Sequence, residues 1–464
     1  MPAETPYRTG SHNIDVQSLD EHALDVIQTL NEAGFDAYLV GGCVRDALCG
    51  VEPKDFDVAT NAKPEEVKSL FRRARLVGRR FPIAHVRYGR NLIEVSTFRQ
   101  GQMDHDDLET NEQGMIVKDQ AFGTMSDDAF RRDFTVNALY YDVTSNEIID
   151  YVGGIEDIQN KTLRFIGETH TRIAEDPVRL LRAIRFGAKL GFTVDPQILQ
   201  DMDDTAERLE AIPKARLFDE FLKLFLTGYG AEVWTAIRDT PLVRSLFPSC
   251  NPASELVLAA MQNTDRRIAD DQPVTPGFLV AVLLWDDFQA KVAEHNPQKK
   301  PDLMYDIAMD TFAVQQQHIT LPRRFTQFAR EVWQLQNRLE SRQPRHIQRI
   351  LGHKRFRAGF DFLVLRGHFD NKLKKLGNWW EEIQFAEKPR QEKMISELPA
   401  GNRRRRRRKK NNQTPNYNTQ YHSESSGNAF GDRNNQDGQG RRDGNFDSYG
   451  NYSPMSNNPG FDEY

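Results

Sequence analysis

The chain has 464 residues, more than one hydrophobic core usually serves, so two or more domains are expected. Its formal net charge of −5 by itself argues against nucleic-acid binding, and its three cysteines exclude a disulfide framework and have no metal-ligand spacing, which favours a reducing compartment. Because the longest apolar run, residues 278–285, is too short to span a bilayer and no secretory signal is apparent, we expect a cytoplasmic protein without a transmembrane segment.

The first elements lead into residues 37–60. We expect a flexible N-terminus over 1–17, then a helix within 18–34, where apolar residues recur at helical spacing. Residues 37–40 follow as a short buried strand. Gly41 and Gly42 lack a Cβ and let the backbone turn tightly and approach a ligand. A short helix over 43–48 would present N–H groups to phosphate, and Arg45 adds a fixed cation.

Two carboxylates come next. We expect a strand from Asp55 through residue 59, in which Asp55 and Asp57 share one face and Phe56 takes the other. Carboxylate oxygens side by side suit Mg²⁺. A phosphate cradle followed by paired carboxylates indicates phosphoryl or nucleotidyl transfer, although an Asp-x-Asp alone is usually solvated at a sheet edge.

Residues 64–128 contain further expected elements. Pro64 begins a helix, a strand falls within 76–86, and residues 92–98 alternate as a strand that carries Glu94. From the pattern alone, Glu94 is an edge residue paired with Arg99 or solvent; a second role for it is implied by the resemblance described below. The acidic, aperiodic residues 101–128 predict a mobile loop.

Residues 131–142 and 172–192 hold the next polar clusters. Arg131 or Arg132 could neutralise a triphosphate, and Asp133 and Asn137 could hold a ribose, a metal or each other; the alternative is a helix start capped by Asp133. In the second cluster, Asp176 and Arg179 are neighbours on a helix that begins at Pro177, with Arg182 and Arg185 beyond them. They form either a weak surface ion pair or a rigid pair that presents donors and acceptors to a base.

The chain beyond residue 195 is predicted to be helical, with apolar core stripes at 215–230, 254–261, 278–285 and 325–339. Basic stretches between them are solvated faces or, together with Phe325, Trp333 and Phe356, an RNA-holding surface.

The last segment is different in composition. Residues 403–410 hold eight positive charges, which leaves about −13 for the remainder of the chain. We expect six arginines to bind RNA phosphates, with a membrane surface or a partner protein as the alternative: Arg403, Arg404, Arg405, Arg406, Arg407 and Arg408. The Asn- and Gly-rich residues after them should be disordered.

The motifs GG-x-V-R-D with D-x-D, RRDF-T-x-N-A and E-D-x-x-R together resemble those of the class II nucleotidyltransferases in the DNA polymerase beta superfamily, which comprise tRNA CCA-adding enzymes and bacterial poly(A) polymerases. The resemblance implies an α+β fold: a polymerase-beta-like head with a mixed sheet and helices, then all-α neck and body domains and a disordered basic tail. The expected boundaries are 18–165 for the head, 166–245 for the neck, 246–395 for the body and 396–464 for the tail.

The resemblance also implies roles for the residues above. Asp133 joins Asp55 and Asp57 in the catalytic set, with Asp133 or Glu94 as the third ligand of two Mg²⁺ ions. The implied nucleotide-binding residues are Gly41, Gly42, Arg45, Asp46, Arg132, Asn137, Asp176, Arg179 and Arg182. In that set Asp46 orients Arg45 or the helix start, and Asp176 with Arg179 acts as a protein template for the base of ATP.

Three features favour bacterial poly(A) polymerases: residues 76–86, the helical region from 263 to 367, and the arginine-rich tail. The implied activity is template-independent addition of AMP from ATP to RNA 3′ ends, which promotes RNA decay and quality control. RNA-decay proteins are implied partners, and a monomer is expected. A CCA-adding enzyme is the alternative, and a non-catalytic RNA-binding adaptor is a further one.

Overall fold

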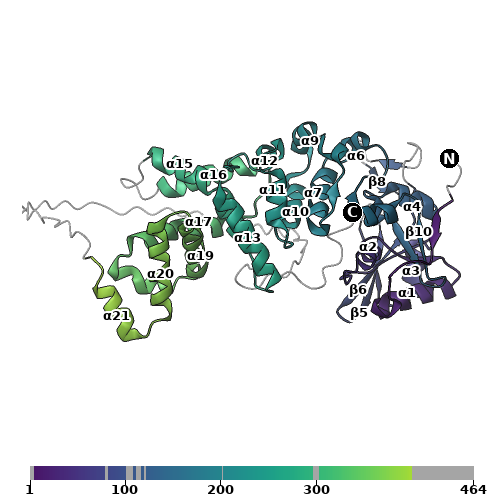
Figure 1. The fold of residues 1–464 in the computed structure, drawn as a ribbon, viewed down its shortest axis with the longest axis horizontal. Coiled ribbons are helices and arrows are strands. Elements are labelled where there is room, and N and C mark those ends of the chain that lie inside the picture. Colours follow the sequence, from purple (N-terminus) through teal and green to yellow (C-terminus); the bar gives the residue numbers. More distant parts are fainter. Residues whose placement is uncertain are drawn as a thin grey trace, which may run out of the picture. The chain divides into compact units, whose positions relative to one another are not determined.

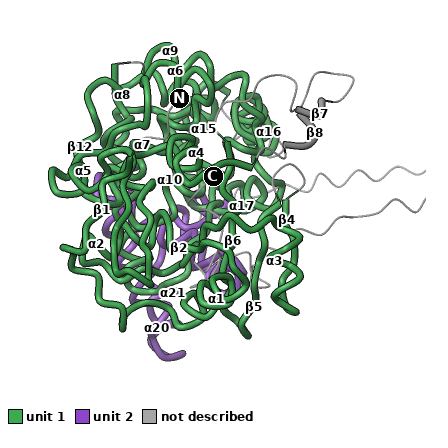
Figure 2. Tube along the Cα trace, turned by 90° about the vertical axis from the view of Figure 1, so that its right-hand side faces the viewer, with its two compact units in different colours: residues 1–333, 450–464 green, residues 334–449 purple. Residues whose placement is uncertain are grey.

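The computed structural model describes residues 5–78, 82–100, 108–110, 116–119, 122–200, 202–295 and 303–399 (Figure 1). These residues belong to two compact units (Figure 2): the first reaches Trp333 and the second begins at Gln334. Arg403 to Arg408 and the predicted disorder after residue 400 lie outside the described residues. No helix in the described ranges has the length and apolar character needed to cross a bilayer.

The first unit begins with a mixed sheet of eight strands in the order β1-β10-β9-β2-β3-β6-β5-β4. The strands are β1 (Tyr7–Thr9), β2 (Ala37–Val40), β3 (Asp57–Thr60), β4 (Ala74–Val77), β5 (Ile83–Tyr88), β6 (Asn91–Thr97), β9 (Leu139–Asp142) and β10 (Glu147–Asp150). Strands β3 and β6 run parallel, and the other neighbouring pairs are antiparallel. The expected mixed sheet is confirmed.

The two faces of this sheet have different neighbours. Helices α1 (Glu21–Glu32) and α3 (Pro64–Leu70) pack on one face, where Val58 and Val95 are buried. The opposite face buries Val40 and Tyr140 in a smaller apolar cluster. Because Asp57 lies in register with Val40, its side chain belongs to this second face, away from α1 and α3.

Several expected elements are present. Helix α1, strand β2, helix α3 and strand β6 lie where the periodicity places them. Asp20 caps α1 by accepting hydrogen bonds from the backbone amides of His22 and Ala23. Apolar periodicity and capping are local signals, so these elements could be predicted without tertiary information.

Three expectations are wrong. Residues 7–9, expected within a flexible N-terminus, form β1, which adds to the sheet edge at β10. Strand β3 begins at Asp57, so Asp55 precedes the strand. The expected loop over 101–128 contains β7 (Leu108–Thr110), β8 (Ile116–Asp119) and the start of α4 (Met125–Arg131), where Thr124 and Asp127 form a capping box.

The remainder of the first unit is mostly helical. Its helices are α2 (Gly42–Leu48), α5 (Gly154–Asn160), α6 (Thr169–Glu175), α7 (Val178–Leu190), α8 (Pro196–Gln200), α9 (Met202–Arg208), α10 (Lys214–Phe225), α11 (Gly230–Ile237), α12 (Pro241–Leu246), α13 (Glu255–Ala269), α14 (Pro276–Leu283), α15 (Trp285–His295), α16 (Leu303–Gln316) and α17 (Arg323–Ser341), in which the unit ends. Strands β11 (Thr162–Leu163) and β12 (Thr193–Val194) form a separate parallel pair.

Aromatic side chains fill the helical core. The Trp333 ring stacks on those of Phe288 and Phe312, with centroids 4.3 and 5.0 Å apart. Trp333 and Phe325 are 1% and 2% exposed, and Phe356 is also buried. Buried rings cannot stack on bases, so the suggested role of these three residues in holding RNA is wrong.

The second unit is a small helical domain. After the end of α17 it contains α18 (Ile347–Leu351), α19 (Phe356–Gly367), α20 (Asn371–Phe385) and α21 (Lys388–Ser396). Its core is built around Trp380, whose indole N–H donates to the Leu339 carbonyl at 2.9 Å. Helix α21 includes residue 396, the first residue of the expected tail.

Candidate active site

A row of polar side chains crosses one face of the sheet. Asp57 on β3 lies in register with Glu94 on the parallel strand β6, and Glu94 lies in register with His85 on β5. Residues in register point to the same face. Glu94 is 7% exposed, and one of its carboxylate oxygens, Oε1, lies 3.2 Å from Nε2 of His85. The alternative in which Glu94 is an edge residue paired with Arg99 or solvent is wrong, because β6 lies between β3 and β5 and Glu94 contacts His85.

The carboxylates suit a magnesium site that substrate completes. Asp55 is exposed just before β3, and Asp57 is half-buried. Within the described ranges, no three His, Cys, Asp or Glu side chains form a ready-made metal cluster. Mg²⁺ usually binds through one or two carboxylates together with substrate phosphates, so a pair of acids on neighbouring strands fits that donor set.

The glycine turn lies at the end of β2. Gly41 has a φ of 79°, which favours glycine, and its amide donates to the Leu139 carbonyl on β9. Helix α2 begins at Gly42, immediately beyond the strand that pairs with β3. The turn and the first carboxylates are therefore close in the fold.

Arg45 is held inside the protein. It is 2% exposed, and it donates to the Asp46 carboxylate at 2.8 Å and to the side-chain oxygen of Asn137 at 2.5 Å. The predicted contact between Asp46 and Arg45 is present. The N–H groups of Arg45 face Asp46 and Asn137, so the guanidinium holds the glycine turn against residues 131–142.

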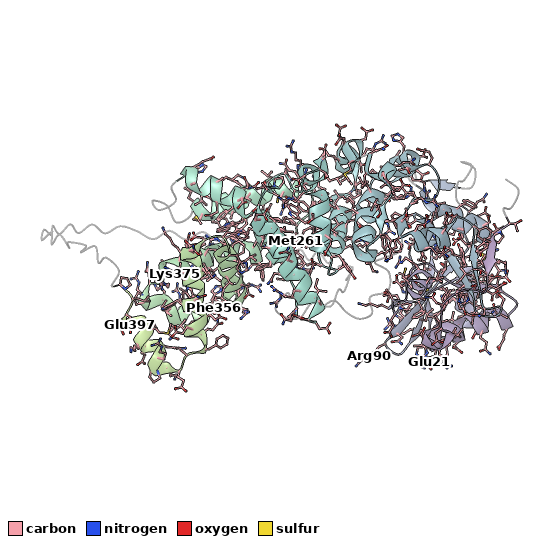
Figure 3. The ribbon with its side chains drawn as sticks, in the orientation of Figure 1. Glu21, Arg90, Met261, Phe356, Lys375 and Glu397 are labelled. Carbon is pink, nitrogen blue, oxygen red and sulfur yellow. The ribbon has the colours of Figure 1, made fainter. Side chains whose placement is uncertain are left out.

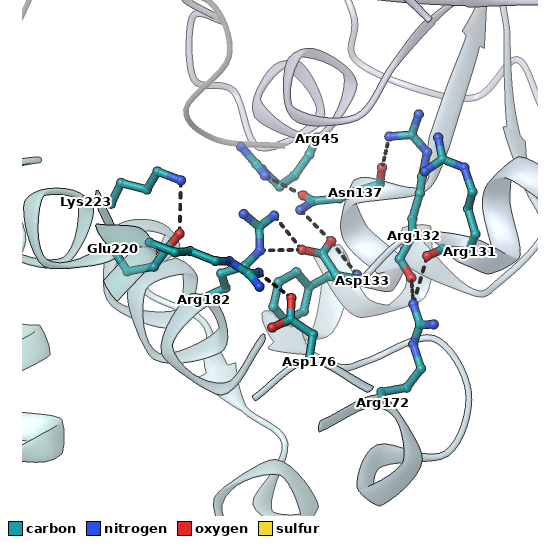
Figure 4. Close-up of polar contacts among 12 residues, drawn as sticks. Arg45, Arg131, Arg132, Asp133, Asn137, Arg172, Asp176, Arg182, Glu220 and Lys223 are labelled. Carbon is teal, nitrogen blue, oxygen red and sulfur yellow. Dashed lines mark hydrogen bonds and ion pairs between the residues drawn. The ribbon is translucent and has the colours of Figure 1, made fainter. Parts of the chain in front are cut away.

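Asp133 is the centre of a second cluster (Figure 4). Its Oδ2 accepts two hydrogen bonds from Arg182, at 2.9 and 2.6 Å, and its Oδ1 accepts from the Phe134 amide at 2.8 Å. Asn137 donates to Oδ1 at 3.5 Å. Burial alone would raise the pKa of Asp133, but the Arg182 cation and these hydrogen bonds hold that pKa below its usual value.

The arginines of the RRDF motif have a partner that the sequence analysis missed. The fully buried Asp128 accepts from Arg131 at 2.8 Å, from Arg132 at 3.1 Å and from the Tyr140 hydroxyl at 2.7 Å. Burial opposes ionisation of Asp128, yet the two arginines lower its pKa. The sequence signal for this partner is the position of Asp128 on one helix face, three residues before Arg131 and four before Arg132.

The expected pair of Asp176 and Arg179 is wrong in this structure. Asp176 pairs with Arg216 of α10 at 2.5 Å, and Arg179 bonds to Glu175 at 2.6 Å. Pro177 interrupts the helix, so Asp176 has extended backbone angles while Glu175 lies one turn before Arg179. Arg216 comes from 40 residues further along the chain, beyond the reach of spacing arguments.

Comparison with protein families matches three parts of the chain. Residues 37–164 match the family described as "Poly A polymerase head domain". Residues 191–254 match "Probable RNA and SrmB- binding site of polymerase A", and residues 298–413 match "Polymerase A arginine-rich C-terminus".

Comparison with individual proteins finds relatives by sequence and a solved structure that shares the fold. Poly(A) polymerase I of Salmonella typhi is 41% identical over 405 residues, which cover 83% of this chain and 87% of that protein. A CCA-adding enzyme of Lactobacillus helveticus is 36% identical over 220 residues, 47% of this chain and 53% of that protein. A solved apo structure of a CCA-adding enzyme shares the fold, with a TM-score of 0.57 at 19% identity, covering 83% of this chain and 90% of that one.

Proposed function

The chain belongs to the bacterial poly(A) polymerase family, and from that premise we propose how its residues add AMP from ATP to the 3′ end of RNA. Polyadenylation by an ATP-using nucleotidyltransferase is the activity that the relatives support over most of the chain. The CCA-adding relative matches less than half of the chain, so the alternative activity fits less well.

Asp55, Asp57 and Glu94 are the proposed ligands of two Mg²⁺ ions. The observation that carries this assignment is the register of Asp57 with Glu94 on parallel strands. Asp133 is the weaker candidate for third ligand, because both of its oxygens already accept hydrogen bonds from protein donors. When bound, Mg²⁺ would make the RNA 3′-hydroxyl more acidic and neutralise charge on the triphosphate and leaving pyrophosphate.

The remaining residues of the site would position the nucleotide. Asp133 holds Arg182, and Asn137 joins Asp133 to Arg45. This chain of contacts ties α2, the segment after α4 and α7 together behind the glycine turn. We propose that Gly41 and Gly42 let backbone approach the triphosphate. The arginine positions are already set, so no reorganisation is needed when charge develops during transfer.

Recognition of adenine is proposed for the start of α7. Asp176 and Arg179 remain the candidates, each now held by a different neighbour, Arg216 and Glu175. Arg132 donates to the Asn137 carbonyl at 3.3 Å, a contact that supports its proposed role in nucleotide binding. Fixed donors and acceptors discriminate bases by leaving a wrong base with unpaired groups.

We also propose the domain roles that follow from the predicted boundaries. The head, residues 18–165, would carry out AMP transfer; the neck, 166–245, would bind the base; and the body, 246–395, would bind RNA with the arginines at 403–408. The expected monomeric state and a partnership with RNA-decay proteins belong to the same proposal. The body boundary differs from the division between compact units at residue 333.

The test is extension of a labelled single-stranded RNA with Mg²⁺ and each of ATP, CTP, GTP and UTP supplied separately. A long ladder with ATP alone on a generic RNA is the expected result. Addition of CTP and then one A, restricted to tRNA-like ends, would overturn polyadenylation in favour of CCA addition.

A further inference from the structure

A hollow lined by arginines lies at the β4 end of the sheet. Its volume is about 710 Å³, and its lining includes Arg72, Arg73, Arg75, Arg87 and His85, here called the arginine hollow. All four arginines are exposed. None of the described residues that line the hollow is acidic, and no described acidic side chain pairs with any of the four arginines.

The hollow is built by the local fold. Arg75 on β4 is in register with His85 on β5, and Arg87 follows two residues after His85, on the same face of that strand. Arg72 and Arg73 lie between the end of α3 and the start of β4. Arg90, labelled in Figure 3, marks the turn between β5 and β6, next to Gly89 in the lining. Four like charges thus share one open surface, and the described part of the chain places no carboxylate in its lining to neutralise them.

The hollow joins the candidate metal site through His85. The register across β3, β6, β5 and β4 is Asp57, Glu94, His85 and Arg75, so all four lie on one face. His85 contacts Glu94 on one side and lines the hollow on the other. Neighbouring strands are about 4.8 Å apart, which places Arg75 roughly 14 Å from Asp57 along the sheet.

We propose that the arginine hollow binds the phosphate backbone of the RNA substrate a few nucleotides before its 3′ end, an assignment that rests on the proposed function. Guanidinium groups match phosphate geometry with paired donors. Phosphate contacts are independent of sequence, as an enzyme that extends generic RNA requires. The sheet face leads directly from the hollow to the carboxylates, so one RNA strand can occupy both.

The first experiment measures binding of a 5′-labelled single-stranded RNA to the full chain by fluorescence anisotropy over a range of salt concentrations. The double variant Arg75→Gln/Arg87→Gln should reduce the magnitude of the slope of log Kd against log salt by about 1.4, because each lost phosphate contact removes about 0.7 for single strands. The matched control is Arg8→Gln, which removes a cation from an exposed arginine on β1 at the other end of the sheet. Its slope should equal that of the wild type.

Further variants guard against a folding defect. Arg75→Lys/Arg87→Lys keeps both charges and should recover most of the wild-type slope. If the glutamine double variant does not fold, Arg75→Gln alone should still lower the slope by about 0.7. The RNA-binding tail is present in every variant, so its contribution cancels.

The second experiment measures KM for RNA in the extension assay. In the glutamine double variant, KM should rise several-fold for a long RNA and rise less for a dinucleotide, whose single phosphate is too close to the 3′ end to reach the hollow. A wild-type salt slope and a wild-type KM in that variant would overturn the proposal. The hollow would then be a candidate site for an acidic protein surface, and the proposed polyadenylation would be unaffected. If the wild type failed to extend RNA but the glutamine double variant still had a smaller salt slope, the proposed function would be overturned. The hollow would nevertheless remain an RNA site.

Discussion

In the first unit, the Asp133 carboxylate accepts hydrogen bonds from Arg182, Asn137 and the Phe134 amide, whereas Glu94 lies in register with Asp57 and contacts the His85 imidazole. Asp133 is thus neutralised by a cation that the protein supplies. Glu94 and Asp57 instead place two anionic groups on neighbouring strands. On the proposed assignment, the Asp133 cluster positions residues, and the pair of Asp57 and Glu94 would bind the metal ions.

The largest effect should come from Asp57. Asp57→Asn keeps the shape of the side chain and removes its charge, so nucleotide incorporation should fall by about 10³-fold or more, equivalent to at least about 4 kcal/mol of transition-state stabilisation. RNA binding should be retained. The control is Glu147→Gln, which removes a carboxylate charge from β10 of the same sheet. Unchanged incorporation in Asp57→Asn would remove the metal assignment and favour a non-catalytic adaptor.

The next effect concerns the positioning cluster. Arg182→Met would leave the Asp133 charge buried without its cation, and we expect a loss of about 3 to 5 kcal/mol in the free energy of unfolding. Urea denaturation of the full chain measures it. Arg179→Met, which breaks a more exposed pair with Glu175, is the matched control and should lose less than about 1 kcal/mol. Equal losses of unfolding free energy in the two variants would mean that Arg182 does not stabilise the Asp133 carboxylate.

A smaller effect is expected on the metal affinity of the proposed site at Asp57 and Glu94. His85→Gln removes the imidazole that contacts Glu94, and loss of a group that orients a metal ligand typically weakens metal binding by about 10- to 100-fold. Titration of Mn²⁺ in the presence of a non-hydrolysable ATP analogue measures the change. Wild-type affinity in this variant would show that Glu94 needs no orienting partner.

The smallest effect is on acid stability. The pKa of Asp133 is lower in the folded chain than the unfolded value of about 3.9, so its ionised form stabilises the fold above that pH. The contribution is lost as pH falls through the folded pKa. Asp133→Asn should therefore flatten the fall in stability below about pH 4, measured by urea denaturation at a series of pH values. An unaltered acid slope would contradict this.

These two clusters also differ in how far they could be predicted from sequence. Asp57 and the glycine turn stand out because strand alternation and turn chemistry are local, whereas the alternation extended the strand too far, to Asp55. The contact between Arg182 and Asp133 joins residues 49 apart, and the pair of Arg216 and Asp176 joins residues 40 apart. Such pairings depend on how helices pack, so spacing favoured the neighbouring Arg179 instead.

The alignment of Glu94 with Asp57 lies between these cases. Alternation predicted a strand at Glu94, but its register depends on pairing with β3, which no local pattern specifies. Asp128 was missed for a different reason. The acidic residues around it predicted a loop, while the capping box at Thr124 and Asp127, which starts helix α4, was overlooked.

We propose above all that Glu94, and not Asp133, completes the metal site with Asp57. The most direct measurement is the affinity of the full chain for Mn²⁺, detected by electron paramagnetic resonance with the same ATP analogue, in the wild type, Glu94→Gln and Asp133→Asn. We expect weaker Mn²⁺ binding in Glu94→Gln and near wild-type Mn²⁺ binding in Asp133→Asn. Weakened binding in Asp133→Asn with none in Glu94→Gln would contradict it.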